Sequence, residues 1–275
     1  MHRDAALEFD PLARQLQQLA VRRAWVMAAE PRVDSTNERV RALVESIDGG
    51  VCAPVLFVAG EQSAGVGRRG ARWLSAPGDG LWFSLVVPAG PELPDAPPAL
   101  ALAGRLAGVL QEQGVSATVK WPNDLYLEEG KLGGLMIERR RLGGKTCWLA
   151  GVGINWRQPA GPLDAGYRAS AISEAGDGWR GDSSLLALSL VEAAVKVMSC
   201  PADWPVEMAR LSRQHHGFGK SVAVEHGNGV CATGIAGVIR PDGDLEITRS
   251  DGRVIRAGPH DRVRVLVEGA GRDSY

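Results

Sequence analysis

A segment rich in glycine and arginine follows the apolar run from Ala53 to Gly60. Its glycines and arginines are Gly65, Gly67, Arg68, Arg69, Gly70 and Arg72, and Trp73 ends it. Glycine lets backbone N–H groups approach a ligand closely, and the planar arginine fork matches phosphate or carboxylate oxygens. The glycines also fit the G-x-G-x-x-G spacing of a dinucleotide-binding turn, but the residues after Trp73 lack the pattern of the helix that such a turn must open. We therefore expect an anion-binding loop and no nicotinamide site.

Four further segments contain polar side chains or glycines that helix capping, turns or tight packing explain only in part. They are Asp34-Ser35-Thr36-Asn37-Glu38, Lys120-Trp121-Pro122-Asn123-Asp124, Lys131-Leu132-Gly133-Gly134 and Gly151-Val152-Gly153-Ile154-Asn155. Ser35 and Glu38 have the spacing of a capping box, and most such pairs only begin a helix. Glycine weakens a strand unless another group packs closely against it. The glycines of the last two segments therefore indicate either tight packing or a bound ligand.

The charge balance excludes a global attraction to nucleic acid or to anionic membranes. The 275 residues include 31 lysines and arginines and 32 aspartates and glutamates, for a formal net charge of -1. The arginines at 139 to 141 lack an aromatic stacking platform, so we interpret them as the solvated edge of a hairpin. The four cysteines lack the C-x-x-C spacing of a zinc site or a disulfide framework. Without a signal-peptide layout or an apolar run of membrane length, the sequence predicts a cytoplasmic protein.

Strands and helices must position these segments. Short apolar runs predict strands at 53–59 and 81–87 in one sheet, and strands at 135–138 and 147–155 joined through Gly143-Gly144. Helical spacing predicts helices at 97–113 and 183–198, and a third that begins at 34–38. This mixture predicts an α+β fold, with a mixed sheet flanked by helices, rather than a repeated βαβ winding. After Gly217, short β-branched runs and turns predict a small module of about five strands.

Taken together, these segments resemble the biotin protein ligases. The resemblance covers about residues 30 to 268. It depends on Asp34-Ser35-Thr36-Asn37, Gln62 through Trp73, Lys120 through Leu125, Lys131 through Gly134 and Gly151 through Asn155, in the family's order and spacing. It implies an N-terminal extension at 1–30, a class II synthetase-like biotin/lipoate ligase domain at 31–217 and an SH3-like barrel at 218–275. The DNA-binding domain of the repressor-type members is missing from the sequence.

The resemblance implies an enzyme that activates biotin with ATP and attaches it to a lysine of the biotin carboxyl carrier protein of acetyl-CoA carboxylase. It implies no tightly bound cofactor, no DNA or membrane partner, and a monomer or weak homodimer. Arg68 and Lys131 would be catalytic, holding the biotin carboxylate and the α-phosphate. The biotin contacts would be Ser35, Thr36, Asn37, Gln62, Gly65, Gly67, Arg68, Lys131, Gly134 and Gly151. The nucleotide contacts would be Arg68, Trp73, Asn123, Asp124, Lys131 and Asn155, with Asp124 also a ligand of Mg²⁺.

The sequence departs from the family's Gly-Arg-Gly-Arg-x-Gly-Arg pattern at two positions. Val66 and Ala71 stand where the family has its first and last arginines, whereas Arg68 is retained. Arg72 lies one residue late, which changes the direction of its side chain. Two alternatives remain: a lipoate or octanoate ligase of the same fold, and a biotin-binding protein whose catalysis is weakened by these changes. The polar Ser35, Thr36, Asn37 and Gln62 favour a ureido ring over a plain acyl chain.

Overall fold

A mixed sheet of seven strands forms the centre of the computed structural model, which describes residues 7–90, 96–159, 168–176, 179, 181–226, 229–258 and 261–266. The strands are β1 (Val26–Glu30), β2 (Val55–Ala59), β3 (Gly80–Pro88), β4 (Ala117–Lys120), β5 (Asp124–Leu127), β6 (Gly130–Leu142) and β7 (Lys145–Asn155). Their order is β1-β2-β3-β7-β6-β5-β4. Only β1 and β2 are parallel, and the other neighbours are antiparallel. This confirms the α+β class and the predicted strand pairs.

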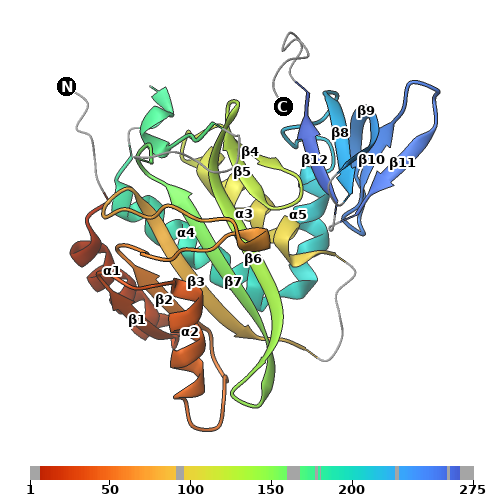
Figure 1. The fold of residues 1–275 in the computed structure, drawn as a ribbon. Coiled ribbons are helices and arrows are strands. Elements are labelled where there is room, and N and C mark those ends of the chain that lie inside the picture. Colours follow the sequence, from red (N-terminus) through yellow and green to blue (C-terminus); the bar gives the residue numbers. More distant parts are fainter. Residues whose placement is uncertain are drawn as a thin grey trace.

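Helices cover both faces of this sheet (Figure 1). They are α1 (Phe9–Arg23), α2 (Thr36–Glu45), α3 (Pro98–Glu112), α4 (Ser183–Ser199) and α5 (Trp204–Leu211). Side chains of a strand alternate between its faces. Leu56 and Val58 of β2 accordingly join one buried cluster with α1, α3, α4 and α5, whereas Phe57 joins another with α2. Burial on both faces explains why β2 is a continuous apolar run.

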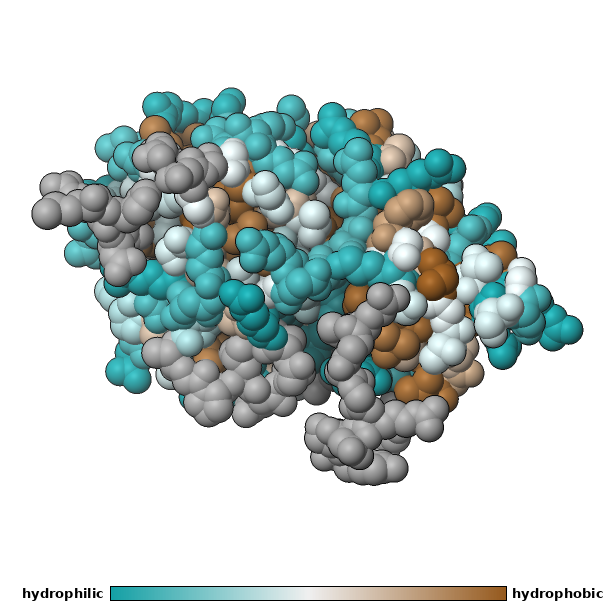
Figure 2. All heavy atoms as spheres, turned by 90° about the horizontal axis from the view of Figure 1, so that it is seen from above, coloured by the Kyte–Doolittle hydropathy of each residue, from teal (hydrophilic) through white to brown (hydrophobic). Residues whose placement is uncertain are grey.

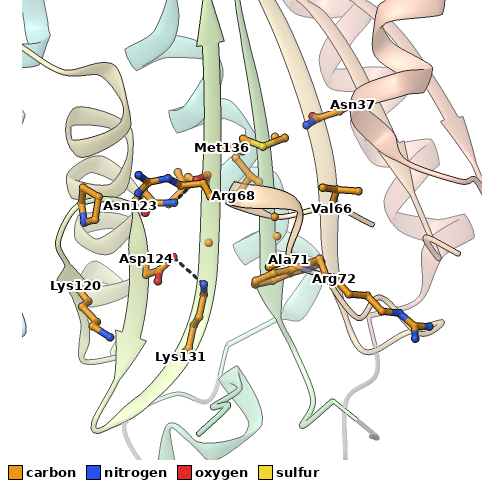
Figure 3. Close-up of a pocket in the computed structure, with 18 of the residues that line it drawn as sticks. Asn37, Val66, Arg68, Ala71, Arg72, Lys120, Asn123, Asp124, Lys131 and Met136 are labelled. Carbon is orange, nitrogen blue, oxygen red and sulfur yellow. Dashed lines mark hydrogen bonds and ion pairs between the residues drawn. The ribbon is translucent and has the colours of Figure 1, made fainter. Parts of the chain in front are cut away.

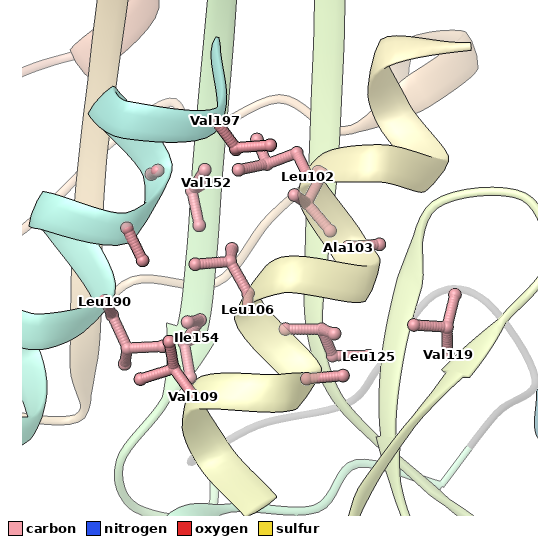
Figure 4. Close-up of a cluster of buried hydrophobic side chains, with 14 of the residues drawn as sticks. Leu102, Ala103, Leu106, Val109, Val119, Leu125, Val152, Ile154, Leu190 and Val197 are labelled. Carbon is pink, nitrogen blue, oxygen red and sulfur yellow. The ribbon is translucent and has the colours of Figure 1, made fainter. Parts of the chain in front are cut away.

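The larger cluster fixes α3 against α4 and the sheet. Figure 4 shows Leu106 and Val109 of α3 close to Leu190 of α4 and Ile154 of β7. All four side chains are at most 4% exposed. Pro98 occupies the first turn of α3, where a missing N–H costs nothing, as the sequence predicted. No single described helix is long and apolar enough to cross a membrane. Residues 183–211 pass that test only as a pair of helical segments bent by 96°.

The amino-terminal segment contributes to the large sheet, although the sequence analysis assigned it no element. Helix α1 buries Leu12, Leu16, Leu19 and Ala20, which recur at helical spacing. The chain then turns at Ala24 into β1, which pairs in parallel with β2. Helix α1 also packs against α4. The region matched by the family resemblance is thus joined to the segment before it through backbone hydrogen bonds.

The carboxy-terminal part forms a second, smaller sheet. Its strands are β8 (Ser221–His226), β9 (Gly229–Ile239), β10 (Leu245–Thr248), β11 (Val254–Ala257) and β12 (Arg262–Val265), in the order β11-β10-β9-β8-β12. All neighbours are antiparallel, which confirms the predicted module of five strands. Its closure into an SH3-like barrel stays a prediction. The surface seen from above is mostly hydrophilic, with apolar patches over this sheet (Figure 2). Val230, Ile235 and Val254 are among its exposed apolar side chains.

The packing of α1 predicts that truncation of one of its buried side chains lowers the free energy of unfolding. Leu16→Ala should lower the free energy of unfolding by about 2–5 kcal/mol, because the fully buried leucine leaves a cavity. Val21, on the same helix, is 71% exposed, so Val21→Ala should change stability by less than about 0.5 kcal/mol. Urea unfolding followed by circular dichroism measures both. Equal effects would show that α1 does not pack as described.

Candidate functional site

A cavity of about 640 Å³ lies over β6 and β7, beneath the glycine-rich loop (Figure 3). Its lining comes from α2, that loop, β4 to β7 and β12. The predicted site residues in the lining are Ser35, Thr36, Asn37, Gln62, Gly67, Arg68, Trp73, Asn123, Asp124, Lys131, Gly134 and Gly151. The fold thus brings together residues from five sequence segments. Two predicted residues, Gly65 and Asn155, lie outside the lining.

Thr36 and Gln62 begin a buried polar network at one side of the cavity. The amide N–H and the hydroxyl of Thr36 donate to Gln62 Oε1 over 2.8 and 3.0 Å. Gln62 Nε2 in turn donates to Ser75 Oγ at 2.9 Å. Ser84, fully buried in β3, places its hydroxyl 2.8 Å from Thr36 Oγ1 and 2.6 Å from Asn37 Oδ1. The network therefore holds hydroxyl and amide groups in fixed directions.

The capping box predicted for Ser35 and Glu38 is wrong. Ser35 is the N-cap of α2, but its side chain makes no capping hydrogen bond. Glu38 forms an ion pair with Arg41 at 2.6 Å, one turn along the helix. The polar residues of this segment therefore do not serve to cap the helix, and Ser35, Thr36 and Asn37 line the cavity.

Arg68 and Lys131 lie at another side of the cavity, each held by a partner from the Lys120–Asp124 segment. Arg68 Nη1 donates to Asn123 Oδ1 at 2.7 Å, and Asn123 Nδ2 donates to the Leu135 carbonyl. Lys131 Nζ lies 2.8 Å from Asp124 Oδ1, and both side chains are largely buried. Figure 3 shows both cations on the opposite side of the cavity from Asn37. The partners fix where the two positive charges sit.

Glycines on β6 and β7 make room for these groups. A Cβ at Gly151 would lie 2.5 Å from Asn37 Oδ1. A Cβ at Gly153 would lie 2.6 to 2.8 Å from atoms of the Trp73 indole, and one at Gly134 would lie 3.3 Å from it. Lys131 Nζ is 5.3 Å from the Trp73 ring, within cation–π range. Close approach by side chains of this chain therefore explains the glycines at these three positions.

The glycine-rich loop is a narrow hairpin. Trp73 N donates to Gly65 O at 2.8 Å, and Gly67 N donates to Ala71 O at 2.7 Å. This pairing sets Val66 opposite Arg72. Val66 and Ala71 line the cavity, and Val66 is 52% exposed. Arg72 points away from Arg68 and Lys131 (Figure 3) and also lines a neighbouring cavity of about 260 Å³. In this structure Arg72 does not replace the cation missing at position 71.

Asn155 and Gly65 support the cavity from behind. Asn155 Nδ2 donates to the carbonyls of Lys131 and Ser170 and so holds the strand that carries Lys131. Gly65 is buried, and a Cβ there would lie 2.7 Å from Trp73 O. Their predicted contacts with biotin and with the nucleotide stay predictions.

Sequence reasoning missed several lining residues. These are Lys120, Tyr126, Met136, Arg262 and Arg264, to which the buried Ser84 can be added. Lys120 Nζ donates to the Tyr126 hydroxyl at 3.0 Å. Burial lowers the pKa of Lys120; the Asp124 carboxylate opposes this shift, and Lys131 and Arg262 add to it. The serine inside the apolar run of β3 could have been recognised from the sequence as a polar group in a buried strand. The sequence around the arginines of β12 gives no such indication of a site.

Among the described residues, no group of three or more His, Cys, Asp or Glu side chains could hold a metal ion. Asp124 is already paired with Lys131. Mg²⁺ commonly uses only one or two protein carboxylates together with phosphate oxygens and water. The Asp124 carboxylate therefore fits a magnesium ion that arrives with a phosphate ligand.

Part of this chain is similar in sequence to known proteins. Residues 31–155 match the model of the biotin/lipoate A/B protein ligase family. The bifunctional ligase/repressor BirA of Escherichia coli K12 is 36% identical over 139 residues, which are 47% of this chain and 40% of BirA. The biotin–acetyl-CoA-carboxylase ligase of Paracoccus denitrificans is 34% identical over 140 residues, 49% of this chain and 55% of that protein. The matched segment thus spans about half or less of these relatives.

A solved structure extends the similarity of the fold. The biotin protein ligase from Aquifex aeolicus in complex with biotin and ATP superposes with a TM-score of 0.68 and 24% identity. The superposition covers 88% of this chain and 99% of that protein. The mixed sheet and its helices therefore have the same fold as that protein.

The contact between Gly153 and Trp73 predicts that Gly153→Ala moves the loop. The added methyl would overlap the indole, which should cost about 1–3 kcal/mol of stability and change the near-ultraviolet circular dichroism of tryptophan. Gly108→Ala is the matched control, because its nearest neighbour would be 3.7 Å away and alanine is favoured in a helix by about 1 kcal/mol. An unchanged tryptophan spectrum in Gly153→Ala would contradict the contact.

Proposed function

We propose that this chain is an ATP-dependent biotin protein ligase, and the match of residues 31–155 to the model of the biotin/lipoate A/B protein ligase family supports this proposal. It converts biotin and ATP to biotinyl-5'-adenylate and pyrophosphate. It then transfers the biotinyl group to a lysine of the biotin carboxyl carrier protein of acetyl-CoA carboxylase.

One observation carries this proposal: a single cavity holds a fixed set of hydroxyl and amide groups on one side and two fixed cations on the other. The Thr36, Asn37 and Gln62 side supplies hydrogen-bonding groups for the ureido ring of biotin. The Arg68 and Lys131 side supplies positive charge for its carboxylate. A lipoyl or octanoyl chain has no polar group that could form hydrogen bonds with this side of the cavity, so its binding would not gain the free energy of such bonds.

The first half-reaction joins two anions. A carboxylate oxygen of biotin attacks the α-phosphorus of ATP, and the bond from that phosphorus to the pyrophosphate oxygen breaks. Arg68 and Lys131 offset the repulsion between the reactants and stabilise the charge that develops on the phosphoryl oxygens. Since Asn123 and Asp124 already hold these cations, little reorganisation is needed when the charge develops. Asp124 would hold a magnesium ion that arrives with ATP, and this ion would share the neutralisation of the phosphates.

Trp73 offers its indole face to the adenine. The ring lies over glycines of β6 and β7 and beside the Lys131 ammonium. The hairpin that carries it covers the cavity and excludes water, which protects the reactive mixed anhydride from hydrolysis. In the second half-reaction the uncharged amine of the carrier lysine attacks the anhydride carbonyl. AMP leaves, and the amine loses a proton to solvent.

The carboxy-terminal sheet completes the cavity in this proposal. Arg262 and Arg264 line it from β12, and the Glu225 carboxylate lies 3.7 and 3.2 Å from their respective Nε atoms. Their charge suits the phosphates of ATP. We place the boundary between the catalytic domain and an SH3-like domain between residues 217 and 218. We propose that the protein is a monomer or a weak homodimer.

Exchange of labelled pyrophosphate into ATP tests the proposed function. The purified chain should catalyse exchange that requires biotin, and lipoate or octanoate should not replace it. Transfer of biotin to the carrier protein then tests the second half-reaction. Exchange that depends on lipoate or octanoate would identify the alternative ligase, and binding of biotin without exchange would identify a protein that has lost catalysis.

Removal of either cation should reduce adenylate formation. Arg68→Ala and Lys131→Ala should each slow pyrophosphate exchange by about a hundredfold or more, the scale for losing one transition-state charge or donor. Arg72→Ala is the matched control, since Arg72 lies in the same loop and points away from the two cations. Circular dichroism should show that all three variants are folded. Normal rates in Arg68→Ala and Lys131→Ala would refute the assignment of the active site.

Val66 predicts weak retention of the adenylate. If the loop closes mainly through charge, Val66→Arg should slow release of biotinyl-adenylate by about tenfold, roughly 1.5 kcal/mol for one charge-assisted contact. The dissociation rate of the adenylate can be measured directly in both proteins, with Val66→Leu as an apolar control. Unchanged or faster release in Val66→Arg would show that valine closes the loop by burial instead.

A further inference from the structure

The structure assigns Trp121 as a positioning residue that holds the carboxy-terminal sheet against the cavity through its indole N–H. This inference rests on the proposed function and deepens it, because it concerns how the ATP side of the cavity is assembled. Trp121 Nε1 donates to the carbonyl oxygen of Gly243 at 2.9 Å, and the bond is buried. Trp121 is 4% exposed and also lines the cavity.

On one side of this contact, Trp121 begins the turn that holds the two cations. Asn123 and Asp124 follow it by two and three residues and bind Arg68 and Lys131. Asn123 O also accepts from Leu135 N at 3.0 Å, which fixes the turn on β6. These bonds do not involve the Trp121 indole, so loss of its N–H leaves the anchors of both cations in place.

On the other side, Gly243 lies in the turn that joins β9 to β10. Gly243 N donates to Arg240 O, and Arg240 N donates to Asp244 O, so the turn is internally closed. Gly243 has φ +89°, and a Cβ at this position would overlap Pro97, which precedes α3. The turn is thus seated between Trp121 and Pro97 of the large domain.

The small sheet transmits this contact to the cavity. Strand β9 pairs with β8, and β8 pairs with β12, whose Arg262 and Arg264 line the cavity. Other contacts also join the two parts: His216 N donates to Val119 O, Ile239 N to Ser212 O, and Lys220 pairs with Glu129. These keep the sheet attached when the Trp121 bond is lost. We therefore expect Arg262 and Arg264 to shift their positions while the small sheet stays attached to the large domain.

Trp121→Phe removes the N–H and keeps an aromatic ring. It should raise the KM for ATP in pyrophosphate exchange by about five- to tenfold, the scale of one buried hydrogen bond. The dissociation constant for biotin should stay within twofold, because Thr36, Asn37 and Gln62 belong to other elements. Trp204→Phe is the matched control: Trp204 Nε1 also donates to a buried carbonyl, that of Val197 at 2.7 Å, but Trp204 does not line the cavity.

A second pair of variants approaches the contact from the small sheet. Gly243→Ala places a methyl against Pro97 and should raise the KM for ATP to a similar extent. Gly252→Ala carries the same backbone strain, at φ +79°, in the turn between β10 and β11, where a Cβ would meet nothing within 4 Å. It should leave the KM for ATP unchanged. Thermal unfolding of all four variants separates loss of stability from loss of positioning.

Amide hydrogen exchange at residues 240–244 and 262–265 gives a readout that does not require catalysis. Both segments should exchange faster in Trp121→Phe and Gly243→Ala than in their controls. The inference is overturned if the KM for ATP stays within twofold in both variants, or if the controls raise it equally. If the unmodified chain shows no biotin-dependent exchange, the proposed function fails, and the amide exchange alone decides whether Trp121 holds the sheet.

Discussion

The site depends on how closely other parts of the chain approach β6 and β7. A strand normally carries a side chain at every second position on each face, and these side chains keep any covering segment several ångströms from the backbone. Glycine at 134, 151 and 153 removes that spacing, so Trp73 and Asn37 contact the sheet backbone directly. The hairpin of the glycine-rich loop lies over the same strands. These glycines therefore let Trp73 and Asn37 lie close to the strands that carry the cavity.

The polar groups around the edge of the cavity are held by partners before any ligand binds. Gln62 joins Thr36 to Ser75, Asn123 holds Arg68, and Asp124 holds Lys131. Burial of a cation without a partner costs desolvation free energy. A cation in a very strong ion pair, however, would not be available to bind a substrate. The partner that Asn123 offers to Arg68 is an amide oxygen, which carries no net charge. Lys131, by contrast, has a carboxylate partner, so an incoming anion must compete with Asp124 or recruit magnesium to it.

Local patterns in the sequence predicted what depends on nearby residues. The helix at Pro98, the hairpin through Gly143-Gly144 and the five strands after Gly217 follow from spacing and turn residues, and the structure confirms them. The cavity-lining segments were recognised by type, but their partners were not. The contact of Ser84 with Asn37 spans 47 residues, and Arg262 reaches the cavity only through the order of strands in a second sheet. Helix α1, by contrast, could have been predicted from the helical spacing of its apolar residues.

The parallel pair of β1 and β2 has a further consequence for what counts as the folding unit. The family match begins at residue 31, after β1 ends at Glu30. A chain starting there would leave the β2 edge with unpaired N–H and C=O groups, and would uncover the face of α4 that α1 buries. An exposed strand edge beside an apolar surface is a template for association between chains. The folding unit therefore includes α1 and β1, which precede the residues that the family model matches.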